Sequence, residues 1–231
     1  MCTYEPSGDP AHYYDQFYDQ VNWSEGIGSA VVRGIHKKME KGLNGHRFDS
    51  CLELGGGNGQ HLDFVLHGFD EYVLLDLRTA QLPDKWENDP RIRKIEANAE
   101  RIPFPNGRFD RIVVTCLLHH VDSAENVLSE IERLLKPNGS ATIFVPCDPG
   151  FLVRIARRLT TQRRAKRLGF NNYGLYIARE HKGHISSILR IARNVLRSRD
   201  IKIKWSPFPF PTWNFNGFAI ITVNGKNQSD S

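Results

Sequence analysis

The sequence has no apolar run that could cross a membrane. Its apolar runs, such as residues 112–114 and 116–118, are no longer than strands, whereas a membrane-spanning helix needs roughly 20 apolar residues. The first residues include Pro and Asp where a secretion signal would carry basic and then apolar residues. We therefore expect a cytoplasmic protein.

Cysteine is scarce, with four residues in 231, and none of them forms a C-x-x-C pair. No Cys and His residues stand at the spacing of a zinc site, and His181 and His184 have no apparent third or fourth ligand. Cys51, Cys116 and Cys147 lie at or beside expected strands. We therefore expect buried, reduced thiols and no metal site.

Acidic residues are nearly missing from one region. Residues 151–200 contain 13 Lys and Arg but only two Asp and Glu, although the whole chain has a net charge of +5. The rest of the chain is therefore net acidic. Such an uneven charge indicates that the basic region meets an anionic partner.

The length and composition, with 40% hydrophobic and 25% charged residues, predict one globular domain over residues 1–231. Strand-like and helix-like segments alternate in residues 45–145, which predicts a doubly wound, mostly parallel sheet of the α/β class. Helical spacing of apolar side chains predicts N-terminal helices in residues 11–41. The strands of the parallel part are expected at residues 51–54, 72–75, 92–95, 111–116 and 141–145.

Two helices are expected between these strands. The first is short and turns Leu62, Val65 and Leu66 inward, and the second covers residues 125–135. A break is expected at residues 136–139, where the sequence reads KPNG.

The last third of the chain has a different pattern. Its expected elements are a basic helical stretch, a mixed loop, a helix and two strands, at residues 151–168, 171–184, 185–197, 201–205 and 218–223. We interpret residues 146–200 as a basic, acceptor-side insertion. The two final strands have no helix between them, which predicts an antiparallel hairpin at the edge of the sheet, residues 201–223.

A glycine-rich loop directly follows the first expected strand. Residues without a Cβ atom let the backbone lie against a ligand, and backbone N–H groups at the start of the next helix then point at that ligand. A plain tight turn would have the same composition. The loop consists of Gly55, Gly56, Gly57, Asn58 and Gly59.

The spacing of this loop indicates its ligand. A dinucleotide fingerprint that starts at Gly55 would need Gly or Ala where Gln60 stands, and no P-loop sequence is present. Asp76 ends the second expected strand, where a carboxylate can accept hydrogen bonds from both ribose hydroxyls. Asp76 could also cap the following helix, but the combination of loop, spacing and acid favours a cofactor site.

Residues 51–62 resemble the first motif of class I S-adenosylmethionine-dependent methyltransferases, and Asp76 resembles the ribose-binding acid of that family. The segments EANAERIPFPNGRFDRIVVTCLLHH and LLKPNG resemble the family's stretch through the fourth strand and the turn before the fifth. The resemblance covers roughly residues 45–145. It implies a Rossmann-like fold with a seven-stranded sheet that ends in a reversed hairpin, and S-adenosylmethionine as the cofactor.

The resemblance also implies roles for individual residues. It implies that Glu53 and the glycine loop hold the methionine end and that Asp76 holds the ribose. Leu77, Asn98 and Ala99 would contact the adenine, and Thr115 would line the space near the methyl group. The family usually has Asp where this chain has Asn98. An amide carries no charge, so the backbone N–H of Ala99 could supply part of the adenine contact.

Methyl transfer to an oxygen requires that the oxygen lose its proton, usually to His or to a carboxylate. Two groups of residues are candidates for this role. His119 and His120 follow the fourth expected strand, and Glu180, His181 and His184 lie in the basic, acceptor-side region. Each of them could instead have a purely structural role.

The run of basic residues at 154–167 contains no acidic residue, although a solvated helix face usually mixes both signs. Three partners fit such a run: a phosphorylated acceptor held by arginines, an anionic membrane that carries a lipid-linked acceptor, and nucleic acid. We favour the first. The apolar side chains expected to form one face of this helix are Leu152, Ile155, Ala156 and Leu159.

Two aromatic groups each have two interpretations. The N-terminal group could cover the cofactor or pack, and the group before the last strand could form a substrate wall or brace the hairpin. We expect packing for most of them. The groups are Tyr13, Tyr14, Phe17 and Tyr18, and Phe208, Phe210, Trp213 and Phe215.

Together these patterns predict a methyltransferase that acts on an oxygen of a small or medium-sized anionic acceptor, such as a nucleotide- or lipid-linked sugar. A nucleic-acid methyltransferase is an alternative. It is disfavoured because residues 114–117 read VTCL, where such enzymes carry an N-P-P-[YF] or Pro-Cys motif. A noncatalytic, cofactor-binding subunit is a second alternative, since it would keep the same cofactor motif.

Overall fold

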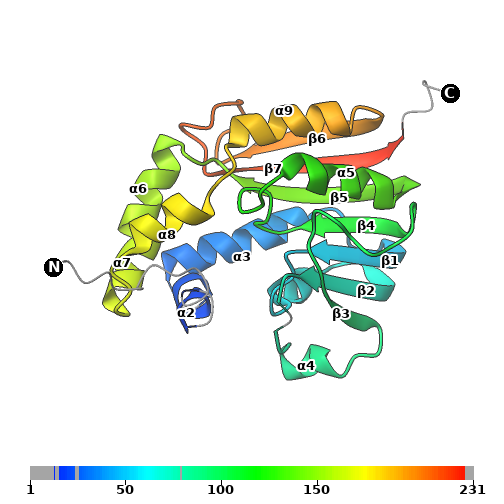
Figure 1. The fold of residues 1–231 in the computed structure, drawn as a ribbon, viewed down its shortest axis with the longest axis horizontal. Helices are drawn as coiled ribbons and strands as arrows, with labels where there is room; N and C mark the ends of the chain where they lie inside the picture. Colours follow the sequence, from blue (N-terminus) through cyan, green and yellow to red (C-terminus); the bar gives the residue numbers. More distant parts are fainter. Residues whose placement is uncertain (1–12, 14–15, 24–25, 79, 227–231) are drawn as a thin grey trace.

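A seven-stranded sheet forms the centre of the computed structural model, which describes residues 13, 16–23, 26–78 and 80–226 (Figure 1). The strand order is β3-β2-β1-β4-β5-β7-β6. All neighbours are parallel except β7, which runs antiparallel to both β5 and β6. The strands are β1 (Arg47–Leu54), β2 (Gly68–Asp76), β3 (Ile92–Glu96), β4 (Phe109–Val114), β5 (Leu135–Pro146), β6 (Arg199–Ser206) and β7 (Phe218–Lys226). The predicted mostly parallel sheet with a reversed C-terminal end is confirmed.

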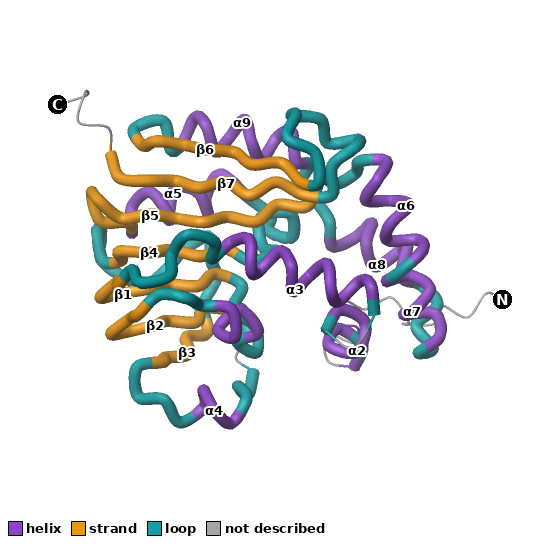
Figure 2. The backbone as a smooth tube through the Cα atoms, turned by 180° about the vertical axis from the view of Figure 1, so that it is seen from behind, coloured by secondary structure: helices purple, strands orange, loops and turns teal. Residues whose placement is uncertain are grey.

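Helices cover both faces of this sheet (Figure 2). Helices α5 (Ala124–Leu134) and α9 (Ile185–Val195) pack together on one face, and α3 (Ile27–Met39) crosses the other. Side chains alternate along a strand, so Ile112 and Val114 of β4 join the core under α5 and α9, while Val113 packs with α3. Two short helical turns complete this part, η1 (Gln60–Phe64) and α4 (Asp84–Glu87). Within the described residues, no helix is long and apolar enough to cross a bilayer.

A group of four helices gathers beyond the end of the sheet at which β5 leads into α6 (Figures 1 and 2). These helices are α2 (Tyr18–Asn22), α6 (Phe151–Leu159), α7 (Thr161–Arg167) and α8 (Tyr173–Glu180), and we call them the helical cap. Tyr13 is buried against Phe170, Tyr173 and Tyr176, with the Tyr13 and Tyr176 ring centroids 4.2 Å apart. The packing expected of the N-terminal aromatic group is confirmed for Tyr13, and Tyr14 lies outside the described residues.

A buried network of charged and polar groups connects α3 to the sheet. Arg111 of β4 donates hydrogen bonds to Glu40 (2.5 Å) and His67 (3.1 Å), and His61 contacts both Glu40 (3.1 Å) and His36 (2.7 Å). Burial lowers the pKa of His36 to about 3, and the neighbouring His61 acts in the same direction. Although burial alone would raise the pKa of Glu40, its hydrogen bond with His61 and the charge of Arg111 lower that pKa to about 2.

Two segments differ from the prediction, one after the first expected strand and one before the fifth. The helix after the glycine loop is only the 3-10 turn η1, and Leu66 is exposed rather than inward. The turn ends there because Val65 adopts an extended conformation. Residues 136–139, where a break was expected, belong to β5, which begins directly after α5 ends. The pairing of β5 with β4 shifts register in this part of the strand.

Residues 146–200 contain four helices where two were predicted. Part of the mixed loop expected at residues 171–184 is helix α8, because Tyr173 and Tyr176 lie one turn apart and face the aromatic core of the cap. The basic stretch is divided at Thr160 into α6 and α7. Of the apolar side chains predicted to form one face of this helix, Ile155 and Leu159 are exposed.

The aromatic residues of the β6–β7 loop do not pack as expected. Phe208, Phe210, Trp213 and Phe215 are all at least 40% exposed. The loop is held instead by the buried side chain of Asn216. Its amide group accepts a hydrogen bond from the Phe208 N–H and donates to the carbonyl oxygens of Phe210 and Thr212.

Candidate active site

The glycine loop between β1 and η1 needs glycine for two different reasons. Gly55, Gly57 and Gly59 have φ values of 76°, 49° and 73°, a region in which residues with a Cβ are strained. A Cβ on Gly55 would lie 3.1 Å from the carbonyl oxygen of Thr115, and one on Gly59 would lie 2.8 Å from Leu82. A Cβ on Gly57 would meet nothing within 4 Å. The first and last glycines therefore permit close packing, whereas Gly57 faces open space that a ligand could occupy.

Asp76, at the end of β2, contacts this loop directly. Its Oδ2 accepts a hydrogen bond from the backbone N–H of Gly57 at 2.9 Å. Leu77, the next residue, is 66% exposed. The predicted ribose acid and the predicted methionine-binding loop are thus adjacent, and their contacts with a cofactor remain predictions.

The predicted adenine contacts lie at the same edge of the sheet. The backbone N–H of Ala97 bonds to the Asp76 carbonyl oxygen at 2.9 Å, which places Asn98 and Ala99 beside the end of β2. The side-chain oxygen of Asn98 accepts a hydrogen bond from the Glu100 N–H at 2.8 Å, while Ala99 is buried. The Asn98 oxygen therefore stabilises its own turn in this structure.

Glu53 lies beneath the glycine loop and is fully buried. The Tyr72 hydroxyl donates to one carboxylate oxygen at 2.9 Å, and the Thr115 hydroxyl lies 3.3 Å from the other. Burial raises the pKa of Glu53, against the influence of His61 and of these two hydrogen bonds. These contacts fix the loop that follows β1, and the predicted contact of Glu53 with the methionine end stays a prediction.

The N-terminal part of the chain contacts the glycine loop through Asp19 of α2. The Asn58 amide donates to Asp19 Oδ2 at 2.9 Å, and the Gln60 amide donates to Asp19 Oδ1 at 2.6 Å. The sequence gives no sign of this contact, because Asp19 is about 40 residues away in an amphipathic segment. Helix α2 thus lies over the loop as part of the candidate site.

The chain leaves β4 in an unusual conformation. Cys116 has a φ of 55°, which non-glycine residues seldom adopt and which is found disproportionately at functional sites. Thr115 is anchored beside it, with its hydroxyl 3.2 Å from the Gly55 carbonyl oxygen. Cys116 is exposed, contrary to the expectation of buried thiols, whereas Cys51 and Cys147 are buried and free as expected.

Three of the five predicted catalytic residues come together beyond β4. The rings of His119, His120 and His181 have centroids 4.0 to 4.9 Å apart, and one nitrogen from each lies within 4.8 Å of the others. We call this set the histidine cluster. Glu180 borders it, since its carboxylate lies 3.9 Å from His120 Nδ1. His184 is exposed at the start of α9 and is not one of the three.

Gly183 allows the two halves of the cluster to meet. The backbone N–H groups of Lys182 and Gly183 both donate to the His119 carbonyl oxygen, at 2.8 and 3.1 Å. A Cβ on Gly183 would lie only 3.0 Å from His119 Cα and 3.1 Å from the Leu118 carbonyl oxygen. The segment after α8 is therefore packed directly against the loop after β4, which brings His181 to His119 and His120.

Asp148, which sequence reasoning missed, orients the cluster from the end of β5. Its carboxylate accepts a hydrogen bond from His181 Nδ1 at 2.6 Å and two from the Arg157 guanidinium at 3.0 and 2.5 Å. Although burial opposes ionisation, these partners hold the pKa of Asp148 well below its usual range. Arg157 therefore turns toward the site, unlike the exposed Arg154 and Arg158 of the same helix.

Burial favours the neutral form of the His119 and His120 imidazoles. Burial lowers the pKa of His119 well below its ordinary value, and the neighbouring His120 and His181 add to this effect. Burial and the charge of His181 likewise lower the pKa of His120 to about 3. Both rings therefore have a nitrogen lone pair at neutral pH.

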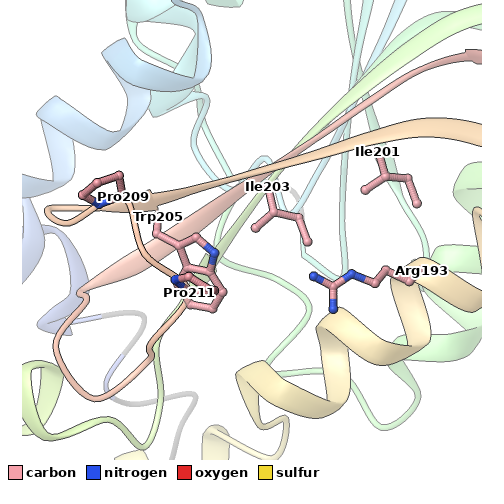
Figure 3. A pocket seen from close by; sticks show the side chains of 6 residues that line it. All are labelled: Arg193, Ile201, Ile203, Trp205, Pro209 and Pro211. Atoms are coloured by element: carbon pink, nitrogen blue, oxygen red, sulfur yellow. The ribbon is translucent and has the colours of Figure 1, made fainter.

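A hollow of about 530 Å³ lies elsewhere, between α9, β6 and the β6–β7 loop (Figure 3). It is lined by Arg193, Ile201, Ile203, Trp205, Pro209 and Pro211. None of these residues belongs to the glycine loop or the histidine cluster. The hollow is therefore separate from the candidate active site.

Residues 52–143 match the family model described as a methyltransferase domain. Among curated proteins, the ubiquinone/menaquinone biosynthesis C-methyltransferase UbiE of Erwinia tasmaniensis is 28% identical over 62% of this chain and 60% of its own length. The UbiE protein of Francisella tularensis is 30% identical over 53% of this chain and 52% of its own length. The chain thus matches only about half to three fifths of the length of these relatives.

The fold is shared with solved methyltransferases. The N-methyltransferase NodS of Bradyrhizobium japonicum, in complex with S-adenosyl-L-homocysteine, has a TM-score of 0.64 at 10% identity and covers 96% of this chain and 100% of that one. A protein of Methanococcus maripaludis described as a putative S-adenosyl-L-methionine-dependent methyltransferase has a TM-score of 0.59 at 16% identity, with both chains fully covered. Residues 52–143 therefore match a methyltransferase domain, and the chain has the fold of these solved methyltransferases.

The family match confirms the resemblance on which the cofactor prediction rested, and S-adenosylmethionine is the cofactor of such domains. The matched residues of the methyltransferase domain include the glycine loop, Asp76 and His119, but they end before Asp148 and His181. The histidine cluster is thus built partly from residues that the family model does not match.

Proposed function

We propose that this chain is an S-adenosylmethionine-dependent methyltransferase that methylates a hydroxyl oxygen of an anionic acceptor, and that the acceptor hydroxyl binds at the histidine cluster. The observation that carries the proposal is the continuity between the two halves of the site. Gly55 packs against Thr115 and Leu117, and the same loop continues to His119, against which Gly183 packs. The cluster is therefore connected directly to the predicted methionine-binding loop.

The residues at the carboxyl edge of the sheet fit the cofactor of this family. Gly57 faces open space, Asp76 is positioned to accept ribose hydroxyls, and Ala99 offers its backbone N–H near the predicted adenine edge. When bound, S-adenosylmethionine supplies a methyl group on a sulfonium, which departs as a neutral thioether. Asp19 of α2, bonded to Asn58 and Gln60, holds the cap over this loop.

An oxygen nucleophile must be oriented and must give up its proton as it attacks the methyl group. The histidine cluster supplies nitrogen atoms for such a hydroxyl, and its rings are fixed from behind. His181 is oriented by Asp148, and His120 Nδ1 lies 3.1 Å from the Glu180 carbonyl oxygen. The cluster therefore offers a preorganised place for the acceptor oxygen.

The outer face of α6 favours an acceptor that is carried by an anionic membrane rather than a free phosphosugar. Phe151, Ile155 and Leu159 are 61%, 40% and 52% exposed, and Arg154 and Arg158 lie between them along the helix. Exposed apolar and basic side chains on one face are typical of a helix that lies on an anionic membrane surface. A site that only binds soluble phosphate does not need the exposed apolar side chains.

Carbon methylation is the second candidate. The curated relatives are named as C-methyltransferases of ubiquinone and menaquinone biosynthesis. Methylation of a ring carbon does not require a hydroxyl at the histidine cluster, although a phenol group on the same ring could still bind there. The two candidates differ in the atom that receives the methyl group.

A methyl-transfer screen tests the proposed function. The full chain is incubated with radiolabelled S-adenosylmethionine and with phosphosugars, anionic glycolipids in vesicles, quinols or RNA. We expect transfer to the vesicle-borne acceptors, and loss of that transfer in a Phe151→Ser/Leu159→Ser variant that still binds the cofactor. Transfer to RNA alone, or cofactor binding without transfer to any acceptor, would contradict the proposal and favour the nucleic-acid or noncatalytic alternative.

A further inference from the structure

We propose that the histidine cluster is a binding site for one divalent transition-metal ion, best matched by zinc, with a coordination position left open on the acceptor side. The ligands are His119, His120 and His181. The sequence hides this site, because its ligands come from two segments about 60 residues apart.

The geometry of the three rings suits a metal ion. One nitrogen from each imidazole lies within 4.8 Å of the other two. Three nitrogens bound to zinc at about 2.0–2.1 Å need to approach one another more closely than this, so small ring rotations would complete the site. Imidazole is a preferred ligand of zinc and its neighbours in the first transition row.

The hydrogen bonds behind the rings are those of a metal-binding histidine set. His181 Nδ1 contacts the Asp148 carboxylate at 2.6 Å, and His120 Nδ1 contacts the Glu180 carbonyl oxygen at 3.1 Å. A ring nitrogen that donates to oxygen leaves the opposite nitrogen, Nε2, as the ligand. A metal-bound histidine typically donates its other N–H to a carboxylate or a backbone carbonyl in this way.

His119 supplies a second, independent observation. The residue is only 2% exposed, and its Nδ1 has no hydrogen-bond partner. Buried polar atoms in folded proteins are almost always paired, so an unpaired one points to a missing ligand. A metal ion bound at Nδ1 would remove this deficit.

Three protein ligands and one open position are typical of catalytic rather than structural zinc sites. If the proposed function holds, the acceptor hydroxyl would take the open position, and the ion would lower its pKa, as a bound metal does for water. This part rests on the proposed function, whereas metal binding itself does not.

Metal binding by the full chain tests the inference without cofactor or acceptor. Protein stripped with a chelator is dialysed against a small excess of Zn²⁺ or Co²⁺, and metal per chain is measured by mass spectrometry, with visible absorption for cobalt. We expect one equivalent in the wild type. His120→Gln and His181→Gln should each weaken zinc binding by at least about tenfold, and Asp148→Asn by about 10- to 100-fold.

His184→Gln is the matched control, because His184 lies three residues from His181 but is exposed and outside the cluster. It should bind metal as the wild type does, and circular dichroism should show that every variant is folded. If a buried variant does not fold, His120→Gln decides, since His120 is the most exposed of the three side chains and its substitution disturbs the core least. Less than a tenth of an equivalent in the wild type, or equal loss in His184→Gln and His120→Gln, would overturn the inference. Failed methyl transfer with intact metal binding would instead count against the proposed function alone.

Discussion

His181 and Asp148 form a hydrogen bond of 2.6 Å between Nδ1 and Oδ2, although 33 residues separate them in the sequence. Arg157 holds the same carboxylate from the other side with two hydrogen bonds. This arrangement joins the end of β5, helix α6 and the segment after α8 at one buried point. Asp148 is therefore expected to matter for stability as well as for the acceptor site.

Asp148→Ala should destabilise the protein by about 3–5 kcal/mol, the usual effect of removing one partner of a buried ion pair. Asp122→Ala is the matched control. Asp122 also pairs with a cation, Lys182, but its side chain is 82% exposed, and surface pairs contribute only about 0–1 kcal/mol. Urea unfolding of both variants measures the difference, and equal small effects would show that the Asp148 pair is not structurally important.

Gly183→Ala should separate the two halves of the histidine cluster. The added methyl group would lie 3.0 Å from His119 Cα, so the backbone must shift, and overpacking of this kind destabilises by about 1–3 kcal/mol. Gly174→Ala on α8 is the control, because a Cβ there meets nothing within 4 Å. The control should be neutral or slightly stabilising. Thermal unfolding decides, and a Gly183→Ala protein as stable as the control would contradict the close packing of Gly183 against His119.

The buried network under α3 predicts a loss of stability in mild acid. His36 has a folded-state pKa of about 3 instead of 6.5, so below pH 6.5 the unfolded chain binds a proton that the folded chain does not. Stability contributed by neutral His36 is therefore present above about pH 6.5 and is lost as the pH falls toward 3, at up to about 1.4 kcal/mol per pH unit.

His36→Gln removes this titration and should give a shallower fall of the unfolding free energy between about pH 6.5 and pH 5. Above that range, the curves of variant and wild type should run parallel, which serves as an internal control. Urea unfolding at a series of pH values measures both slopes. Identical slopes below pH 6.5 would mean that His36 is protonated in the folded protein.

Asp76→Ala should weaken S-adenosylmethionine binding at least roughly tenfold, because two charge-assisted hydrogen bonds of about 1.5–3 kcal/mol each would be lost. The glycine loop also loses its 2.9 Å contact with Asp76, which acts in the same direction. Asp84→Ala, on exposed α4, is the control. Calorimetry with S-adenosylmethionine and with NAD checks both variants. An unchanged dissociation constant, or tight NAD binding by the wild type, would refute the assignment.

The parts of the fold that were predictable are those recorded in local sequence. The strand that runs into Gly55, the acid at Asp76 and the apolar strand before Thr115 each carry a pattern within a few residues, and all of them form the expected cofactor side of the sheet. Helix α8 was missed because the buried side of Tyr173 and Tyr176 is defined by their packing against Tyr13, which lies far away in the sequence.

The proposed acceptor side could be predicted only as a list of candidates. His119, His120 and His181 were identified by chemical type, but nothing near them records that the segment around Gly183 folds back onto His119. Asp148 was missed because its partners, Arg157 and His181, lie 9 and 33 residues further along the chain and meet it only in the folded protein. Contacts of this kind depend on tertiary packing, and the spacing of residues in a single sequence does not reveal them.

The most direct test of the central claim is the position of the transferred methyl group. S-adenosylmethionine labelled with ¹³C at the methyl group is turned over with the acceptor found in the screen, and the product is examined by NMR. We predict a methoxy carbon, formed by the wild type and by His184→Gln at similar rates, and formed at least about 100-fold more slowly by His181→Gln. A methyl group on carbon, or full activity in His181→Gln, would contradict oxygen methylation at the histidine cluster.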